Sequence, residues 1–325
     1  MVTINLTHAL SLWSLSTSAK ATLINVSENR TYLVTDARNV RMILREHRLD
    51  YHSEQEIRSE LMWIEALRHE SDVSVSTVIP GLNGKAIQTV HCNGDASERH
   101  LVMFEFLEGN EPNDDKALYG HFNTLGHATA QLHTHSMQWR KPNNFVRREW
   151  NIDTVLSPHA AWGHWSKGPN VDNVNRPVLS ALESMLIQRL SHIGMGDDVY
   201  GLIHADLRTA NLLLDHEAIH VIDFDDCGFS WYLYDFATAV SFMEDHPRIE
   251  DLKAHWLEGY RRHRHLSCVH EAELDTLILF RRLALLGWMG THANVDIVKD
   301  LSATFAEGTA MLAECYLGMS GQTSV

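Results

Sequence analysis

The chain has 325 residues, 44% of them hydrophobic, and a formal net charge of −15 at pH 7. This length and apolar content suit two domains or lobes, each with a real core. The negative charge argues against a nucleic-acid partner, because phosphate backbones attract basic surfaces.

The apolar segments are too short and too interrupted to cross a membrane. The longest runs, 277–280 and 283–289, are separated by Arg281 and Arg282, whereas a membrane-spanning helix needs about 20 apolar residues. The N-terminus lacks a basic segment followed by an apolar core, which argues against secretion. We therefore expect a soluble cytoplasmic protein without a membrane partner, and the sequence leaves its oligomeric state open.

The cysteines lie far apart and form no C-x-x-C pair. They are Cys92, Cys227, Cys268 and Cys315. We expect buried thiols of a cytosolic protein rather than disulfides or zinc ligands.

The first hundred residues predict a β-rich lobe with one helix. The apolar runs 31–34 and 41–45 are typical of short strands, with a polar turn between them. Residues 53–67 carry apolar side chains at helical spacing, and Ser53 with Glu56 matches a capping box. This lobe therefore combines strands with a single well-marked helix.

An apolar strand that ends at Leu107 is followed by a Glu-Gly pair, which we interpret as a hinge. Beyond it the pattern is mostly helical, apart from the loop-rich stretch 141–177 and a short hairpin. The predicted organisation is α+β, with a small N-terminal lobe (1–107) and a larger, mostly helical C-terminal lobe (108–325).

Histidines and tryptophans are numerous, but their positions favour packing roles. His127, His133 and His135 lie on a run with helical spacing, where buried or surface histidines are commoner than metal ligands. Four tryptophans crowd the loop-rich stretch or its border, and we expect them to pack that irregular segment. They are Trp139, Trp150, Trp162 and Trp165.

The segment 204–211 carries the strongest chemical signal. Asp206 and Asn211 stand, with His204, in the H-x-D-x-x-x-x-N spacing of a kinase catalytic loop. Asp223 follows where a metal-binding aspartate would lie. The first pattern alone could arise by chance in a chain with 22 histidines, but the second acid in the correct order makes a solvated acidic loop the weaker interpretation.

A predicted hairpin connects these groups. Residues 211–214 and 219–222 are typical of two short strands, with a polar turn between them. Asn211 then starts the first strand and Asp223 follows the second, so both emerge at the same end. A carboxylate and an amide carbonyl are hard oxygen ligands that suit a metal ion bound to ATP phosphates.

The segments 201–207, 221–228 and 231–237 carry a resemblance that extends over nearly the whole chain. The sequence resembles the aminoglycoside phosphotransferase and choline kinase superfamily, which shares the protein-kinase-like fold. Within it, the chain is similar to bacterial phosphotransferases grouped with type II homoserine kinases and stress-response kinases.

The resemblance implies a role for each residue of the motif. Asp206 would orient or deprotonate the acceptor hydroxyl, and His204 would brace the catalytic loop. Asn211 and Asp223 would hold Mg²⁺ between the phosphates of ATP, with Asp225 as a looser match for metal or substrate. A later acid, Asp235, would support the loop from below.

The nucleotide-binding residues implied by the resemblance lie in the N-terminal lobe. Glu105 and Leu107 match hinge positions whose backbone groups bind adenine. Arg45 stands where protein kinases place a lysine, and Glu60 is its expected ion-pair partner; an exposed strand-end arginine is the alternative. The phosphate-loop candidate 25–31 has no glycine, so Ser27 and Asn29 would cap the phosphates.

Three functions remain open at this point. The first is a kinase that phosphorylates a hydroxyl of an amino alcohol, a hydroxy amino acid such as homoserine, or an aminoglycoside. The second is a Ser/Thr protein kinase, although the chain lacks an A-P-E element between Asp226 and Asp235. The third is a non-catalytic nucleotide-binding protein, which would have no use for all three of Asp206, Asn211 and Asp223.

Overall fold

The structure, a computed structural model, describes residues 4–26, 29–92, 97–112, 118–215 and 218–322. It divides into two compact units that are not continuous in sequence. Unit 1 combines residues 1–110, 140–147 and 213–225, and unit 2 holds the remainder. The assignment of function to lobes that meet at residue 107 stays a prediction.

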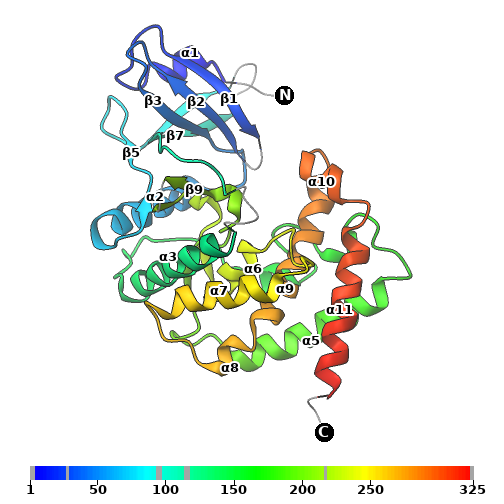
Figure 1. Ribbon diagram of the computed structural model, residues 1–325. Coiled ribbons are helices and arrows are strands. Elements are labelled where there is room, and N and C mark those ends of the chain that lie inside the picture. The colour runs from blue at the N-terminus through cyan, green and yellow to red at the C-terminus, as the bar shows by residue number, and fades with distance from the viewer. Residues whose placement is uncertain (1–3, 27–28, 93–96, 113–117, 216–217, 323–325) are drawn as a thin grey trace. The chain divides into compact units, whose positions relative to one another are not determined.

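Unit 1 is built on an antiparallel sheet with the strand order β1-β2-β3-β7-β5, and β6 also pairs with β7 (Figure 1). Its strands are β1 (Lys20–Val26), β2 (Arg30–Thr35), β3 (Arg41–Glu46), β5 (Val78–Ile79), β6 (Ile87–His91) and β7 (Glu98–Glu105). In β2, Tyr32 and Val34 are buried and pair with Leu44 and Met42. This period of two explains why the sequence predicted β2 and β3 correctly.

Two helices complete unit 1. The short helix α1 (Leu6–Leu10) contributes to the core under the sheet, and the indole of Trp13 donates to the carbonyl of Ile79 at 2.9 Å. Helix α2 (Glu54–Glu70) begins with the predicted capping box. Ser53 Oγ accepts from the Glu56 amide, and the Glu56 carboxylate accepts from the Ser53 amide, which satisfies two free donors of the first turn.

The predicted hairpin belongs to a second, three-stranded sheet with the order β4-β10-β9. Its strands are β4 (Ser74–Val75), β9 (Leu212–Asp215) and β10 (Ala218–Val221). Asn211 does not start the first strand as predicted. It ends a 3₁₀ turn, Thr209–Asn211, immediately before β9. Its side chain therefore does not have to point to one face of the sheet.

Unit 2 is mostly helical, with one antiparallel pair formed by β8 (Tyr200–Ile203) and β11 (Gly228–Trp231). Its helices are α3 (Leu118–Gln138), α4 (Ile152–Val155), α5 (Arg176–Ile193), α6 (Tyr234–Ala239), α7 (Ile249–Arg261), α8 (Cys268–Glu271), α9 (Leu274–Thr291), α10 (Asp296–Leu301) and α11 (Phe305–Gln322). Helix α9 is buried along most of its length and around most of its circumference, as expected for a core helix.

Helices α3 and α7 run side by side in unit 2 (Figure 1). Glycines allow their backbones to approach closely. A Cβ atom at Gly126 would clash with the carbonyl oxygen of Trp256, and one at Gly259 would clash with the carbonyl oxygen of Asn123. Any larger residue would therefore push these two helices apart.

The structure also tests the expectations for the cysteines and the tryptophans. Cys92 and Cys227 are buried, but Cys268 and Cys315 are exposed; all four are free thiols. The buried environment expected for the last two was therefore wrong, because each lies on the outer face of a helix. Three tryptophans of the loop-rich stretch are buried as expected, namely Trp150, Trp162 and Trp165.

The search for membrane and metal-binding features gave negative results within the described ranges. No helix there is long and apolar enough to cross a membrane. No group of three or more His, Cys, Asp or Glu side chains in those ranges could hold a metal ion. His133 and His135 are buried on α3, which agrees with a packing role.

Candidate active site

The predicted catalytic loop follows β8 in unit 2, and helix α6 sets its shape. Ala205 has a positive φ of 64°, which is unfavourable for a residue with a side chain. The conformation is held by Asp235, whose carboxylate accepts from the amides of His204 (3.1 Å) and Ala205 (2.7 Å). Thr238 Oγ1 accepts from the Leu207 amide at 2.9 Å. These bonds support the structural role expected for Asp235.

A buried chain of hydrogen bonds holds Asp235 in turn. His133 lies 3.0 Å from the Asp235 carboxylate through Nε2 and 2.9 Å from the Tyr260 hydroxyl through Nδ1. Burial lowers the pKa of His133, although Asp235 opposes this. A neutral His133 therefore donates to Asp235 and accepts from Tyr260.

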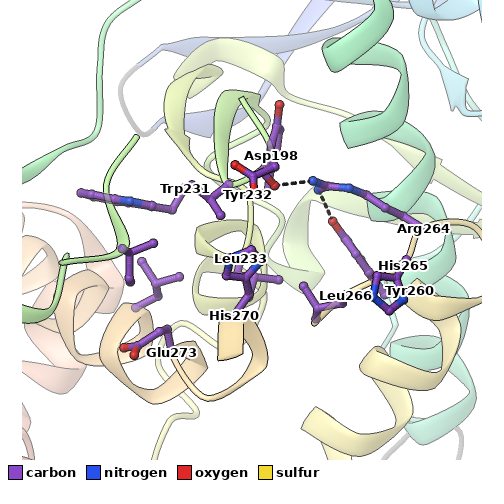
Figure 2. Close-up of a pocket in the computed structure, with 13 residues that line it drawn as sticks. Asp198, Trp231, Tyr232, Leu233, Tyr260, Arg264, His265, Leu266, His270 and Glu273 are labelled. Atoms are coloured by element: carbon purple, nitrogen blue, oxygen red, sulfur yellow. Dashed lines mark hydrogen bonds between the residues drawn. The ribbon is translucent and has the colours of Figure 1, made fainter. Parts of the chain in front are cut away.

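The same chain extends to a small pocket at the far side of Tyr260 (Figure 2). Arg264 donates to the Tyr260 hydroxyl and to the carbonyl oxygen of Asp198, both at 2.7 Å. Its guanidinium also lies over the ring of Tyr232, 4.3 Å from the centroid. Arg264 is thus fixed by three partners, and it holds the Tyr260 hydroxyl at the end of this hydrogen-bond chain.

Asp206 is nearly buried and is surrounded by donors. Its carboxylate accepts from Asn211 Nδ2 (2.7 Å), Arg208 Nε (3.1 Å) and Arg281 Nη2 (2.8 Å). Burial raises the pKa of Asp206, but the charges of Arg208, Arg281 and His204 outweigh this and lower it. The carboxylate is therefore ionised at neutral pH. It is an acceptor of fixed orientation and a weak base.

Asn211 is placed beside Asp206 by the 3₁₀ turn. Its Nδ2 donates to the backbone carbonyl of Asp206 as well as to the carboxylate, at 2.8 and 2.7 Å. This assigns the amide orientation, since only the nitrogen can donate. Within the described residues Oδ1 has no hydrogen-bond donor, and it is free to serve as a ligand.

In unit 1, Arg45 and Glu60 form the predicted ion pair. Arg45 Nη2 lies 2.7 and 2.8 Å from the two oxygens of Glu60, and both side chains are buried. Arg45 Nη1 lies 3.4 Å from the carboxylate of Asp223. Burial opposes the charge of Arg45, but Glu60, Asp225 and Asp223 raise its pKa above the usual value. The alternative of an exposed strand-end arginine is excluded.

The two acids that follow β10 have different surroundings. The Asp223 side chain is 42% exposed, and its backbone has a positive φ of 61°. Asp225 is buried, 3.5 Å from His47 Nδ1 and 3.6 Å from His52 Nε2. Although burial opposes ionisation, the neighbouring His52 imidazole and the charge of Arg45 hold the pKa of Asp225 well below its usual value.

The remaining nucleotide-binding predictions concern residues at or near the ends of strands in unit 1. Glu105 ends β7, and its amide donates to the carbonyl of Thr77 at 2.8 Å; Leu107 follows two residues later. Asn29 is buried, and its Oδ1 accepts from the Arg48 amide at 3.1 Å. Ser27 lies outside the described residues. The contacts of these residues with a nucleotide stay predictions.

The sequence patterns did not indicate several residues that surround Asp206 and Asp225. Arg281 was noticed only as an interruption of an apolar run, and Arg208 lies inside the motif without a predicted role. Both contact Asp206. The available signal was a pair of charged residues within a helix that is otherwise apolar, because an unpaired charge would not be buried there. His47 and His52 left no such signal.

Three features of the site are typical of a kinase-type phosphotransferase. They are the catalytic loop held by Asp235, the ionised Asp206 beside Asn211, and the buried Arg45–Glu60 ion pair between a strand and a helix. The family comparison agrees with this class. The model of the phosphotransferase enzyme family matches residues 21–266. The chain belongs to this family.

Comparison with individual proteins narrows the kind of acceptor. The structure of a microcompartment-associated aminopropanol kinase is 43% identical, with a TM-score of 0.90, over 97% of this chain and 98% of that one. Amicoumacin kinase from Bacillus subtilis (strain 168) is 28% identical over 256 residues, which is 77% of this chain and 73% of that protein. Amicoumacin kinase hAmiN, in complex with AMP-PNP, Ca²⁺ and Ami, has a TM-score of 0.75 at 21% identity over 94% and 92% of the two chains.

These relatives confirm the predicted superfamily and the kinase-like α+β fold. These relatives are named as kinases of small molecules, and the chain is a phosphotransferase with an alcohol group as acceptor. The expected likeness to type II homoserine kinases and stress-response kinases stays a prediction.

Proposed function

We propose that this enzyme transfers the γ-phosphoryl group of ATP to the hydroxyl of a small amino alcohol. The observation that carries this proposal is the 43% identity to an aminopropanol kinase over almost the whole of both chains. The similarity extends over 97% of this chain with a TM-score of 0.90, so it includes the connections between elements, and loops carry much of the substrate recognition in enzymes.

The contacts of Asp206 define its part in the reaction. Two cations and an amide hold its carboxylate ionised and in one orientation. Asp206 accepts a hydrogen bond from the acceptor hydroxyl. This bond orients the hydroxyl so that a lone pair of its oxygen points at the phosphorus atom. Phosphoryl transfer gains most of its rate from such positioning and from electrostatic stabilisation, so a strong base is not required.

Asn211 and Asp223 fit the role of ligands to Mg²⁺. Asn211 presents a free amide carbonyl oxygen, since its nitrogen is committed to Asp206. Asp223 presents a partly exposed carboxylate at the end of β10, next to the hairpin strand that Asn211 precedes. Magnesium in kinases takes one or two protein oxygens together with phosphates and water. When bound, the ion would neutralise charge on the phosphate oxygens.

Arg45 is the residue of unit 1 best suited to contact the phosphates. Glu60 fixes one guanidinium nitrogen, and the other, Nη1, makes a longer contact of 3.4 Å with Asp223. A planar guanidinium donates to phosphate oxygens in a bidentate way, where lysine would supply a point charge. Glu105 and Leu107 would bind adenine through their backbone groups, and Asn29 and Ser27 would lie near the phosphates.

A hollow in unit 2 suits the ammonium group of an amino alcohol. It has a volume of about 260 Å³ and is bordered by Phe242, Phe305, Asp245 and Glu307. The two aromatic rings lie 6.0 Å apart. Aromatic faces and carboxylates are the groups that bind organic cations, and both occur here.

This hollow adjoins the surroundings of the catalytic acid. The guanidinium of Arg208, which contacts Asp206, lies 5.9 Å from the ring centroid of Phe242. Arg282 also borders the hollow, but its charge is balanced by Glu244. In this proposal the acceptor binds with its amine near Asp245 and its hydroxyl directed to Asp206.

An acceptor panel tests this proposal. ADP release should be fastest with 1-amino-2-propanol or ethanolamine, and slower with choline, homoserine and aminoglycosides. 2-Propanol keeps the hydroxyl but lacks the amine, and should give no rate above background. Asp245→Asn should raise the KM for the amino alcohol roughly tenfold, since it removes a charge partner, with the KM for ATP unchanged. Equal rates with and without the amine would refute the proposed acceptor class.

A further inference from the structure

Helix α9 contains two adjacent buried arginines in an otherwise apolar surface. Arg281 is 2% exposed, and Arg282 is 3% exposed. A buried charge is costly unless it is paired and hydrogen-bonded, and apolar residues of similar volume are often at least as stabilising. The presence of arginine at each position therefore needs a specific reason.

Arg281 is directed to the catalytic loop. Its Nη2 donates to Asp206 Oδ1 at 2.8 Å, and its Nε donates to Ser241 Oγ at 3.2 Å. Its guanidinium lies 5.0 Å from the ring centroid of Trp162. These three contacts come from separate segments of unit 2, and they fix the guanidinium relative to the loop.

The pairing of Arg281 is incomplete in a way that stability does not explain. Its Nη1 is buried and forms no hydrogen bond of good geometry with the residues that the structure describes, although, against the effect of burial, the Tyr234 hydroxyl is near enough to raise the pKa of Arg281. A buried donor without a partner opposes folding. Arg282 differs, because it donates to Glu244 at 2.6 Å and to Thr309 at 3.0 Å, and its contacts are those of a structural ion pair.

The other donors to Asp206 leave a task for Arg281. Asn211 holds Oδ2, whereas Arg208 Nε is shared between Oδ1 at 3.1 Å and Oδ2 at 3.2 Å, and the Arg208 side chain is 30% exposed. An exposed arginine is held less firmly than a buried one. Arg281 makes the shorter contact with Oδ1, at 2.8 Å, and it is the buried cation of the two, so it restricts the rotation of the carboxylate more firmly than Arg208 does.

We propose that Arg281 is a positioning residue, which holds the Asp206 carboxylate in the one orientation that accepts the acceptor hydroxyl. The inference rests on the role proposed above for Asp206, but not on the identity of the acceptor. Arg281 acts through Asp206, and neither ATP binding nor folding is its purpose.

A double-mutant cycle between Arg281 and Asp206 tests this coupling. Arg281→Met should lower kcat roughly 10- to 100-fold, because a small misplacement of a catalytic group has an effect of this size. The KM for ATP should stay within about twofold of the wild-type value, since the residue does not contact nucleotide. In an Asp206→Asn background, the same substitution should change the residual kcat by less than about twofold, because the group that it orients is already impaired.

Arg282→Lys is the matched control, since it alters the neighbouring buried arginine without touching Asp206. Its effect on kcat should be the same in the wild-type and Asp206→Asn backgrounds. The proposal is overturned if Arg281→Met leaves kcat unchanged, or if it slows both backgrounds by the same factor. Either result would make Arg281 a structural residue like Arg282.

Folding is checked separately by thermal melting of each variant. If Arg281→Met does not fold, Arg281→Lys replaces it in the cycle, because lysine keeps the charge but not the forked geometry. Its loss in kcat should be smaller and should again vanish in the Asp206→Asn background. If none of the tested acceptors is phosphorylated, the acceptor proposal fails alone, and the same cycle is measured on the hydrolysis of ATP by water.

Discussion

Each unit contains a buried arginine that is paired with an acid, but the two pairs differ in which member is held in place by the other. In unit 1, Arg45 is held by Glu60, a fully buried acid whose two oxygens both contact the same guanidinium nitrogen. In unit 2, Arg281 holds Asp206, the acid predicted to meet the acceptor. Glu60 thus fixes a cation for phosphate, whereas Arg281 fixes an anion for a hydroxyl. The same type of ion pair therefore has two different tasks. The task depends on whether the arginine or the acid of the pair is the member proposed to contact the substrate.

The surroundings of the two pairs agree with this difference. Arg45 Nη1 makes a contact of 3.4 Å with a second acid, Asp223, that is partly exposed, so an anionic ligand can compete with Asp223 for this nitrogen. Asp206 is surrounded by three donors and carries a lowered pKa, so it offers only its remaining lone pairs. Arg45, which would bind an anionic phosphate, keeps one nitrogen in a long contact that a ligand can displace. Asp206, which would orient a neutral hydroxyl, has most of its lone pairs occupied.

The largest effect is expected for Asp223→Ala. Removing this carboxylate should reduce ADP formation below detection and abolish the Mg²⁺ dependence of ATP binding, because a kinase metal site has few protein ligands. Titration calorimetry with and without Mg²⁺ measures the second effect. Asp215→Ala, at the turn end of the same hairpin, is the control and should behave as wild type. Unchanged Mg²⁺-dependent affinity in Asp223→Ala would refute the metal assignment.

Asp206→Asn should come next. It keeps the size of the side chain and removes the charge, so we expect kcat to fall by about 10²- to 10⁴-fold, with the affinity for ATP nearly normal. Single-turnover ADP release and calorimetry measure the two quantities. If kcat with the best acceptor were the same as in the wild type, Asp206 would have no part in the mechanism.

A pair of conservative substitutions distinguishes the two arginines. Arg45→Lys should raise the KM for ATP roughly fivefold or more, because lysine cannot reproduce bidentate contact with phosphate. Arg281→Lys should leave the KM for ATP unchanged and lower kcat. Steady-state kinetics at varied ATP measures both. The same response in the two variants would remove the distinction between a phosphate-binding and an acid-orienting arginine.

The smallest effect is expected for Ser53→Ala at the start of α2. Loss of the capping box should lower the free energy of unfolding by about 1 kcal/mol, measured by urea denaturation. The kinetic constants should not change, although α2 carries Glu60, because the cap lies two turns away from this residue. A rise in the KM for ATP would instead indicate that the Arg45–Glu60 pair depends on the stability of the helix end.

Local patterns explain which parts of the fold were predictable. Strand β2 alternates buried and partly buried residues, β3 is a short apolar run flanked by charged residues, and α2 carries both its apolar stripe and its Ser53 cap, so each is encoded within a few neighbouring residues. Asn211 was misplaced by one element, because a 3₁₀ turn of three residues has no periodicity of its own. The exposure of Cys268 and Cys315 depends on tertiary packing and was equally hidden.

The candidate site was predictable where its residues share a motif or a fixed spacing. Asp206 and Asn211 lie within one loop, and the Arg45–Glu60 pair joins a strand to the helix that follows it. Arg281 lies 75 positions from Asp206, and no local pattern indicates which face of a buried helix meets the loop. The pairing of Asp225 with His47 and His52 likewise joins distant segments.

The close approach of α3 and α7 has a consequence for engineering this enzyme. Replacing glycine by alanine inside a helix ordinarily adds about 0.5–1 kcal/mol of stability, and such changes are a common route to heat-tolerant variants. At Gly126 or Gly259 the added methyl group would instead separate the two helices. His133 and Tyr260 lie on these helices and support Asp235, so the displacement would reach the catalytic loop. Libraries designed for thermostability should therefore leave both glycines untouched, while Gly120, where a Cβ would meet no atom within 4 Å, is open to substitution.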